Sequence, residues 1–292
     1  MVMFTAEEAD KQMRKRILAL VVNYGREQLD YLEQVTTSLK SFKKYDVTVV
    51  VHSNVPLDGI GGIDKVTLFE RKTGIRSLND LLVKLKLGTR WSGRVFNFHM
   101  LPMTCRGVIV RETANYDYFI FTENDHLWHE HHVDHFIRYE ALLPEDRITG
   151  LIQFEINPRG RFYPAYHPPY EWDYDSVEKH GDLLFAHFDN VHQGSFLISQ
   201  RQLMRINSKC DFSNFLSTDH YSPKCKTNTD LYQYCGMRKL ICISEFEENL
   251  IRHLPGIYVE GDLGRDAMGS DERRMRKAID RLLETGAKKY SS

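Results

Sequence analysis

Two carboxylates follow an apolar run near the middle of the chain. The run Tyr118–Phe121 (YFIF) has the composition of a buried strand, and Thr-Glu-Asn-Asp follows it. In extended backbone Glu123 and Asp125 share one face, whereas Asn124 points to the other. Carboxylates at the end of a buried strand suit a divalent cation that keeps positions for substrate phosphates. We therefore expect this pair to bind Mn²⁺ or Mg²⁺, with a solvated turn capped by Asp125 as the alternative.

Five histidines follow within residues 126–135. The run resembles the His-x-His-x-Asp-His pattern of metallo-β-lactamase-like hydrolases, but it has one residue too many before the aspartate. His131 and His135 are four apart and share one helix face, and no third ligand is evident. A zinc-dependent hydrolase built on this cluster therefore stays an alternative function.

A surface helix is the expected structure for most of these histidines. Apolar spacing predicts a helix over residues 129–143, with Val133 and Phe136 facing inward and the histidines largely solvated. His126 is the exception, because it directly follows Asp125.

The elements that must position these side chains alternate in type through the first half of the chain. Helical spacing predicts helices at 28–42 and 97–114. The buried strands expected around them are Ile17–Val22, Val47–Val51, Val66–Phe69 and Tyr118–Phe121. Such alternation indicates an α/β fold with a mostly parallel central sheet, whose ligands bind beyond the carboxyl ends of the strands. The polar residues at two of these ends are Asn23, Tyr24, His52 and Asn54.

The second half of the chain is less regular. Residues 157–175 hold four of the nine prolines and six aromatic residues, which predicts a long structured loop of the kind that lines a substrate groove. The strands expected here are Gly150–Ile156, Leu183–Phe188 and Leu240–Ile243. The helices expected here are Ser199–Ile206, Asn228–Met237 and Glu272–Leu283.

Composition and cysteine usage exclude several classes of protein. The 39 basic and 40 acidic residues give no overall field for nucleic acid, so we expect no nucleic-acid partner. No apolar run approaches the ~20 residues of a membrane helix, so no transmembrane segment is expected. Five cysteines without C-x-x-C spacing, and no Asn-x-Ser/Thr sequon, favour a reducing, cytoplasmic location. A bridge between Cys210 and Cys225 stays open.

Four stretches together resemble the GT-A-fold glycosyltransferases, which use nucleotide-sugar donors. They occur in the family's order: ILALVVNYGREQLDYLEQVTTSL (17–39), FIFTEND (119–125), VHQGSFLISQRQL (191–203) and TNTDLYQYCGMRKLICISEFEENLIRHLPG (227–256). FIFTEND resembles the Asp-x-Asp signature with Glu123 at the first position. The resemblance implies one GT-A-like domain over 1–292, with a smaller mixed acceptor-side region. Its parts are a nucleotide-sugar-binding half (1–126), an acceptor or closing half (127–265) and a tail (266–292).

The resemblance also implies roles for particular residues. His253 matches the late histidine that reaches the metal or the diphosphate, and Arg106 a basic residue near the diphosphate. Gly194 allows close approach of the ligand to the backbone. The donor-binding set expected on all grounds is Asn23, Tyr24, His52, Asn54, Arg106, Glu123, Asn124 and Gly194; the metal set is Glu123, Asp125 and His253.

The catalytic base is where the sequence departs from the family. Many inverting members carry Glu-Asp where this chain has Thr227-Asn228. Asp230 and Glu245 are the first replacements, with Asp219 and Glu247 behind them. The expected function is a metal-dependent transfer of sugar from a nucleotide-sugar donor to a glycan or another hydroxyl acceptor. A catalytically inactive GT-A-like binding module is a further alternative.

Overall fold

The computed structural model describes residues 14–69, 100–158, 160–164, 171–218, 221–256 and 269–291. Strands and helices alternate in the first half of the chain, and strands dominate the second. In chain order the elements are β1 (Lys15–Asn23), α2 (Leu29–Lys40), β2 (Tyr45–Ser53), β3 (Lys65–Leu68), α4 (Met103–Arg111), β4 (Tyr118–Glu123), β5 (His126–Leu127), α5 (Glu130–Leu142), β6 (Arg147–Thr149), β7 (Ile152–Asn157), β8 (Gly160–Pro164), β9 (Trp172–His180), β10 (Leu183–Phe188), β11 (Ser195–Ser199), α6 (Gln200–Lys209), α7 (Pro223–Gln233), β12 (Arg238–Cys242), η2 (Phe246–Asn249), β13 (Leu250–His253), β14 (Gly269–Asp271) and α8 (Glu272–Tyr290).

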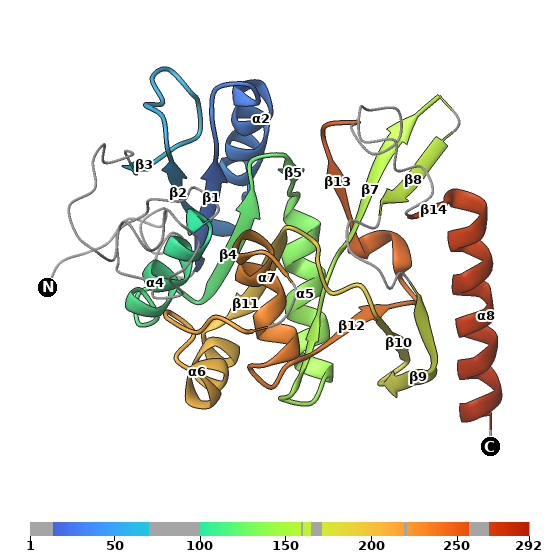
Figure 1. Ribbon diagram of the computed structural model, residues 1–292. Helices are drawn as coiled ribbons and strands as arrows, with labels where there is room; N and C mark the ends of the chain where they lie inside the picture. The colour runs from blue at the N-terminus through green and yellow to red at the C-terminus, as the bar shows by residue number, and fades with distance from the viewer. Residues whose placement is uncertain are drawn as a thin grey trace, which may run out of the picture.

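The first sheet has the strand order β11-β4-β1-β2-β3 (Figure 1). Strands β1 to β4 pair in parallel, and β11 runs antiparallel to β4. The run Ile17–Val22 of β1 is buried throughout, as expected for a strand covered on both faces. Helix α2 packs against β1 and β2, and α6 packs against β11. The register sets Asn23 beside Ser53 and Val22 beside Glu123, so the polar ends of β1, β2 and β4 are adjacent.

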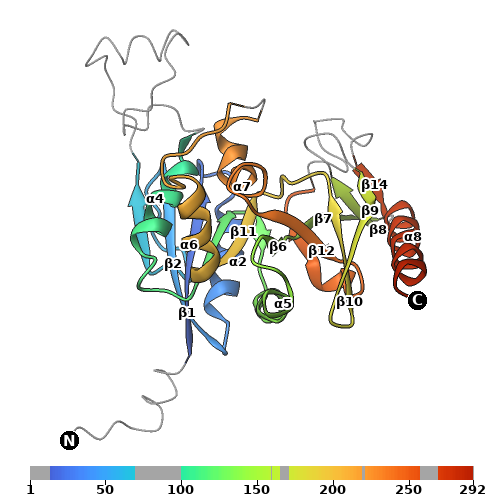
Figure 2. The same ribbon diagram turned by 90° about the horizontal axis from the view of Figure 1, so that it is seen from below.

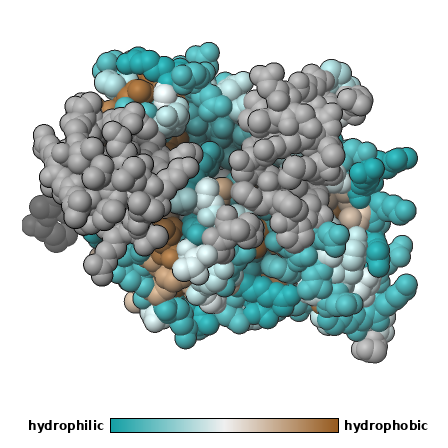
Figure 3. All heavy atoms as spheres, in the orientation of Figure 1, coloured by the Kyte–Doolittle hydropathy of each residue, from teal (hydrophilic) through white to brown (hydrophobic). Residues whose placement is uncertain are grey.

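Two further sheets form the second half of the molecule, with the orders β6-β12-β10-β9 and β14-β8-β7-β13-β5. Helix α8 packs against β8, β9, β10 and β14 through an apolar face that includes Met275, Ile279 and Leu282. It runs along the outer edge of the molecule, and that edge is mainly hydrophilic (Figures 2 and 3). All three sheets contain antiparallel pairs. The α/β class is thus confirmed, whereas the sheets as a whole are mixed rather than mostly parallel.

The predicted loop 157–175 is wrong in part, because β8 and the start of β9 lie within it. Strand β8 forms an antiparallel hairpin with β7, and Pro164 stands at its last position, beyond Phe162, the last residue that pairs with β7. Residues 165–170 lie outside the described residues. Helix α7 begins at Pro223, earlier than expected, since Ser222 caps it and proline suits the first helical position.

The cysteine pairing also differs from the expectation. A disulfide joins Cys210 to Cys235, with 5.8 Å between their Cα atoms. Cys225 instead lies buried in the first turn of α7, where Ser222 Oγ is 3.2 Å from its Sγ. The expected bridge between Cys210 and Cys225 is therefore replaced by one between Cys210 and Cys235. Within the described residues, every helix is too short or too polar to cross a membrane.

Candidate metal centre

Asp125, His126 and His253 come together beyond the carboxyl end of β4. Strand β4 ends at Glu123, and the chain turns through Asp125 into β5. Strand β5 pairs antiparallel with β13 in a register that sets His126 opposite His253. The backbone N–H of Leu254 also donates to the carbonyl of Asp125 at 2.8 Å. The predicted proximity of His253 to the acid motif is therefore present in the structure.

The three side chains are buried, and each offers a potential ligand atom within 4.8 Å of the others. Asp125 Oδ2 lies 3.3 Å from His253 Nε2, and Asp125 Oδ1 lies 3.2 Å from His126 Nδ1. The second pair is close without hydrogen-bond geometry, and neither atom has a hydrogen-bond partner among the described residues. Buried polar atoms normally have partners, so this pair has the character of a ligand set.

Charge in the cluster is shared between two acids and two imidazoles. His253 Nδ1 lies 2.7 Å from Glu155 Oε1, which holds the ring with Nε2 towards Asp125. Burial opposes a charged imidazole, but Asp125 and Glu155 outweigh it and raise the pKa of His253 to about 10. Burial likewise opposes ionisation of Asp125, yet His253 and His126 hold the pKa of its carboxyl well below the usual range. The aspartate is therefore ionised, and His253 has to release its proton when a metal binds.

Gly194 lies against His126. Its φ is +63°, and a Cβ at this position would be 2.5 Å from His126 Cε1. Only glycine fits both the conformation and the space. Its carbonyl accepts the backbone N–H of Glu123 at 3.1 Å, so it also ends the β4–β11 pairing. The predicted close approach at Gly194 is thus to a candidate ligand side chain.

Glu123 has a cation partner outside the cluster. Its Oε2 lies 3.1 Å from Lys224 Nζ, in the first turn of α7. The charge of Glu123 raises the pKa of Lys224, so the lysine is protonated. The structure groups the expected second ligand, Glu123, with a lysine, and His126 takes its place beside Asp125.

The residues expected to bind the donor differ in depth: Tyr24 is exposed, whereas Asn23, Asn124 and His52 are buried. Asn124 donates to Asn23 Oδ1 at 2.9 Å, and the N–H of Gly25 donates to Asn54 Oδ1 at 2.8 Å. Tyr24, beside them, is 59% exposed. His52 is buried beneath these residues, where its Nδ1 lies 2.6 Å from Thr104 Oγ1 of α4.

Neither first candidate for the catalytic base lies in the cluster. Asp230 is fully buried and pairs with Arg106 at 3.0 Å; Arg106 also donates to backbone carbonyls before and within α7. Glu245 accepts from Tyr139 at 2.7 Å and pairs with Arg138, both on α5. Its described hydrogen bonds and ion pairs include none to Asp125, His126 or His253. Asp219 lies outside the described residues, and Glu247 pairs with Arg161 and Arg276.

The histidines of helix α5 are not all solvated, contrary to expectation. Helix α5 is present, but His132 is buried rather than solvated. Its Nδ1 accepts the N–H of His129 at 3.1 Å, so its Nε2 carries the proton and donates to the carbonyl of Leu250 at 3.0 Å. This histidine therefore ties α5 to β13. It has no place in the Asp125 cluster.

Three residues of this region were not assigned from the sequence. For His126 the sequence shows only that it follows Asp125 and begins the 126–135 histidine cluster. Glu155 could have been found as an acid within a predicted buried strand. Lys224 could have been found because it follows the Ser-Pro pair that starts α7.

The donor set of two imidazoles and one carboxylate fits a transition-metal ion such as Mn²⁺ or Zn²⁺ better than Mg²⁺, which prefers oxygen ligands. Asp125, His126 and His253 would hold such an ion. The chain matches no protein-family model, and a search of curated proteins finds no relative.

Proposed function

We propose that the protein is a metal-dependent glycosyltransferase with a GT-A-like fold, which uses a nucleotide-sugar donor. The observation that carries the proposal is the buried Asp125–His126–His253 cluster beyond the end of β4. It lies next to the polar ends of β1 and β2, where ligands of α/β sheets bind.

The surrounding residues suit the parts of such a donor. Tyr24 offers an exposed ring to the base. The amides of Asn23 and Asn124 are buried and bonded to each other, so they fix the adjoining ends of β1 and β4. Lys224 places a positive charge beside Glu123, and such a charge would attract the diphosphate of a donor. A bound divalent cation neutralises the charge that develops on a departing diphosphate.

The proposed reaction breaks the bond between the sugar C1 and the diphosphate oxygen, and forms a bond from C1 to the acceptor oxygen. The proton of the acceptor hydroxyl passes to the departing diphosphate, so the step balances without a base from α7. Asn228, where many inverting members of that family have aspartate, is an amide and cannot accept that proton. Asp230 is committed to its buried pair with Arg106. Neither Asn228 nor Asp230 of α7 therefore serves as the base in this proposal.

A zinc-dependent hydrolase is the second candidate, and the donor set is the observation that favours it. Two imidazoles and one carboxylate are also the ligands of catalytic zinc sites. In this version the ligands are again Asp125, His126 and His253, rather than the helix histidines.

Thermal unfolding with a panel of nucleotide sugars tests the proposal. With Mn²⁺ present, one donor should raise the Tm by several degrees, since a ligand at 100 times its Kd stabilises the native state by about 2.7 kcal/mol. Release of free nucleotide from that donor should then require the metal. If no nucleotide sugar changes the Tm with Mn²⁺ or Zn²⁺, the transferase proposal is wrong. Purified protein that ignores all donors and retains through dialysis one Zn²⁺ that Asp125→Asn removes would support the hydrolase.

A further inference from the structure

Helix α5 and η2 carry a second group of potential metal ligands. His131 and His135 lie one turn apart on α5, and Glu248 lies on η2. Glu248 Oε2 is 3.1 Å from His135 Nε2 and 4.0 Å from His131 Nε2. The sequence had supplied the two histidines without a third ligand, and the fold brings one from more than a hundred positions away.

We propose that His131, His135 and Glu248 bind a zinc ion that bridges α5 and η2. Ligand atoms of a tetrahedral zinc ion lie about 3.3 Å apart, given bonds of about 2.0–2.1 Å. The His135–Glu248 pair is already near this separation. His131 has to rotate towards Glu248 to close the site, since its ring centroid is 6.3 Å from that of His135, and its side chain is 44% exposed. A water molecule completes the coordination.

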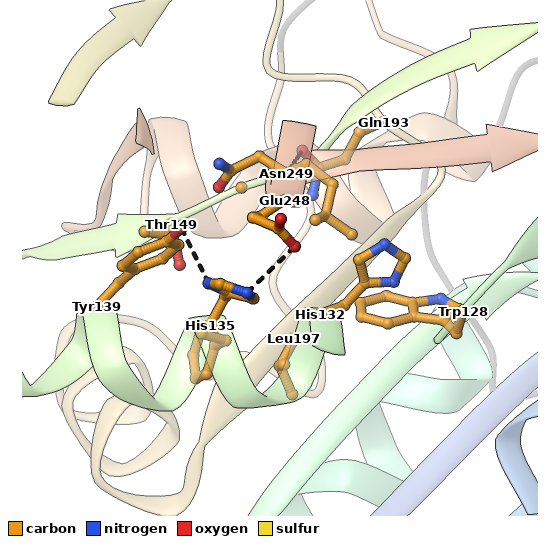
Figure 4. A pocket seen from close by; sticks show the side chains of 12 residues that line it. Trp128, His132, His135, Tyr139, Thr149, Gln193, Leu197, Glu248 and Asn249 are labelled. Carbon is orange, nitrogen blue, oxygen red and sulfur yellow. Dashed lines mark hydrogen bonds and ion pairs between the residues drawn. The ribbon is translucent and has the colours of Figure 1, made fainter. Parts of the chain in front are cut away.

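The surroundings of His135 suit a metal on its Nε2. Zinc replaces the proton on that nitrogen, so the ring then carries its proton on Nδ1 and needs an acceptor there. Tyr139 Oη lies 3.3 Å from Nδ1 and donates its own proton to Glu245 Oε2 at 2.7 Å. Arg138 Nη2 also lies 3.2 Å from Nδ1, so this guanidinium has to turn towards Glu245 before Nδ1 can donate to Tyr139. Figure 4 shows His135 between Tyr139 and Glu248 at the edge of a cavity that Trp128, His132 and Asn249 also line.

The backbone connects this proposed zinc site to the candidate metal centre. The 3-10 helix η2 continues directly into β13, which ends at His253. Zinc at the second site would fasten η2 to α5 and so hold the segment that delivers His253. The inference does not depend on the transferase proposal, because it concerns a different set of ligands.

Titration of Zn²⁺ into the metal-stripped full chain, followed by calorimetry, tests the site. His131→Ala and His135→Ala should each remove one equivalent of Zn²⁺, or weaken it at least tenfold. Asp125→Asn should leave that equivalent in place, and any zinc held at the candidate metal centre should be lost only in Asp125→Asn. The matched control is His180→Ala, because His180 also contacts a glutamate, Glu178, at 2.9 Å but belongs to no such group among the described residues. If both helix variants bind zinc with the number and affinity of the unmodified chain, the proposal is wrong.

Hydrogen exchange gives a second readout in the Asp125→Asn background. Zinc should slow amide exchange across residues 246–253 by several-fold, and His131→Ala should abolish this protection. Equal protection with and without His131 would contradict the bridge between α5 and η2.

Discussion

His253 Nε2 lies 3.3 Å from Asp125 Oδ2, although the two residues belong to opposite halves of the chain. The contact depends on the short β5–β13 pairing, which sets His126 opposite His253. The proposed function rests on this ligand set, which consists of the Asp125 carboxylate and the imidazoles of His126 and His253. The histidines hold the pKa of the carboxylate low.

Asp125→Asn should abolish divalent-cation binding at this centre while keeping the size of the side chain. The amide oxygen is a much weaker ligand than a carboxylate, so the affinity for Mn²⁺ should fall at least a hundredfold in calorimetry. Asp117→Asn is the control, because Asp117 precedes the other end of β4 and pairs with exposed Lys15. Unchanged Mn²⁺ affinity in Asp125→Asn would remove this residue from the ligand set.

Glu155→Gln should weaken metal binding without removing a ligand. Glu155 orients the ring of His253 through Nδ1 at 2.7 Å, and partners of this kind are typically worth 10–100-fold in metal affinity. Metal titration of the variant measures the effect. A buried amide keeps the contact but loses the charge, so circular dichroism should show a folded protein. Metal affinity equal to that of the unmodified chain would mean that Glu155 has no part in positioning His253.

Gly194→Ala should disturb both stability and the metal centre. The added methyl group meets the ring of His126, and the left-handed backbone conformation costs a non-glycine residue about 1 kcal/mol or more. We expect a loss of roughly 2–4 kcal/mol in the free energy of unfolding, together with weaker metal binding.

Gly59→Ala separates these two effects. Gly59 has a φ of +76°, close to that of Gly194, but a Cβ there meets nothing within 4 Å. Denaturant unfolding should show only the backbone cost in this variant, with metal binding unchanged. Equal losses at the two positions would show that the contact with His126 carries no energy.

The first half of the fold was predictable because its signals are local. Runs such as Ile17–Val22 are apolar throughout, and polar residues mark where they end. Parallel pairing then brings the ends together, so the positions of Asn23 and Glu123 follow from strand order alone. Helix α2 was likewise visible in its 3.6-residue spacing.

The rest of the candidate site depends on contacts that no local pattern contains. Strand β5 has two residues, too few for any periodicity, and its partner β13 is distant in sequence. The ion pair of Glu123 with Lys224 forms only after α7 packs in place. Proximity of His253 to Asp125 was expected only from the resemblance to a family. The choice of His126 over Glu123 as the neighbour of Asp125 needed the structure.

Lys239 supplies a prediction about pH that is separate from the metal centre. The side chain is buried, its Nζ lies 3.3 Å from the carbonyl of Asn190, and its stem packs against Gly150. Burial lowers the pKa of Lys239 from 10.5 to about 7. Between these values the unfolded chain binds the extra proton, so the free energy of unfolding rises as the pH rises from 7 to 10.5. The gain should be on the order of 5 kcal/mol.

Lys239→Met isolates this term, because methionine fills a similar volume and does not titrate. Urea unfolding of both proteins at several pH values gives the difference in their free energies of unfolding. The contributions of the other titrating groups are the same in both proteins and cancel in this difference. Relative to the variant, the unmodified chain should be least stable near and below pH 7, where the buried ammonium is charged, and should gain steadily towards pH 10.5. A difference that stays constant over this range would mean that Lys239 keeps its ordinary pKa in the folded protein.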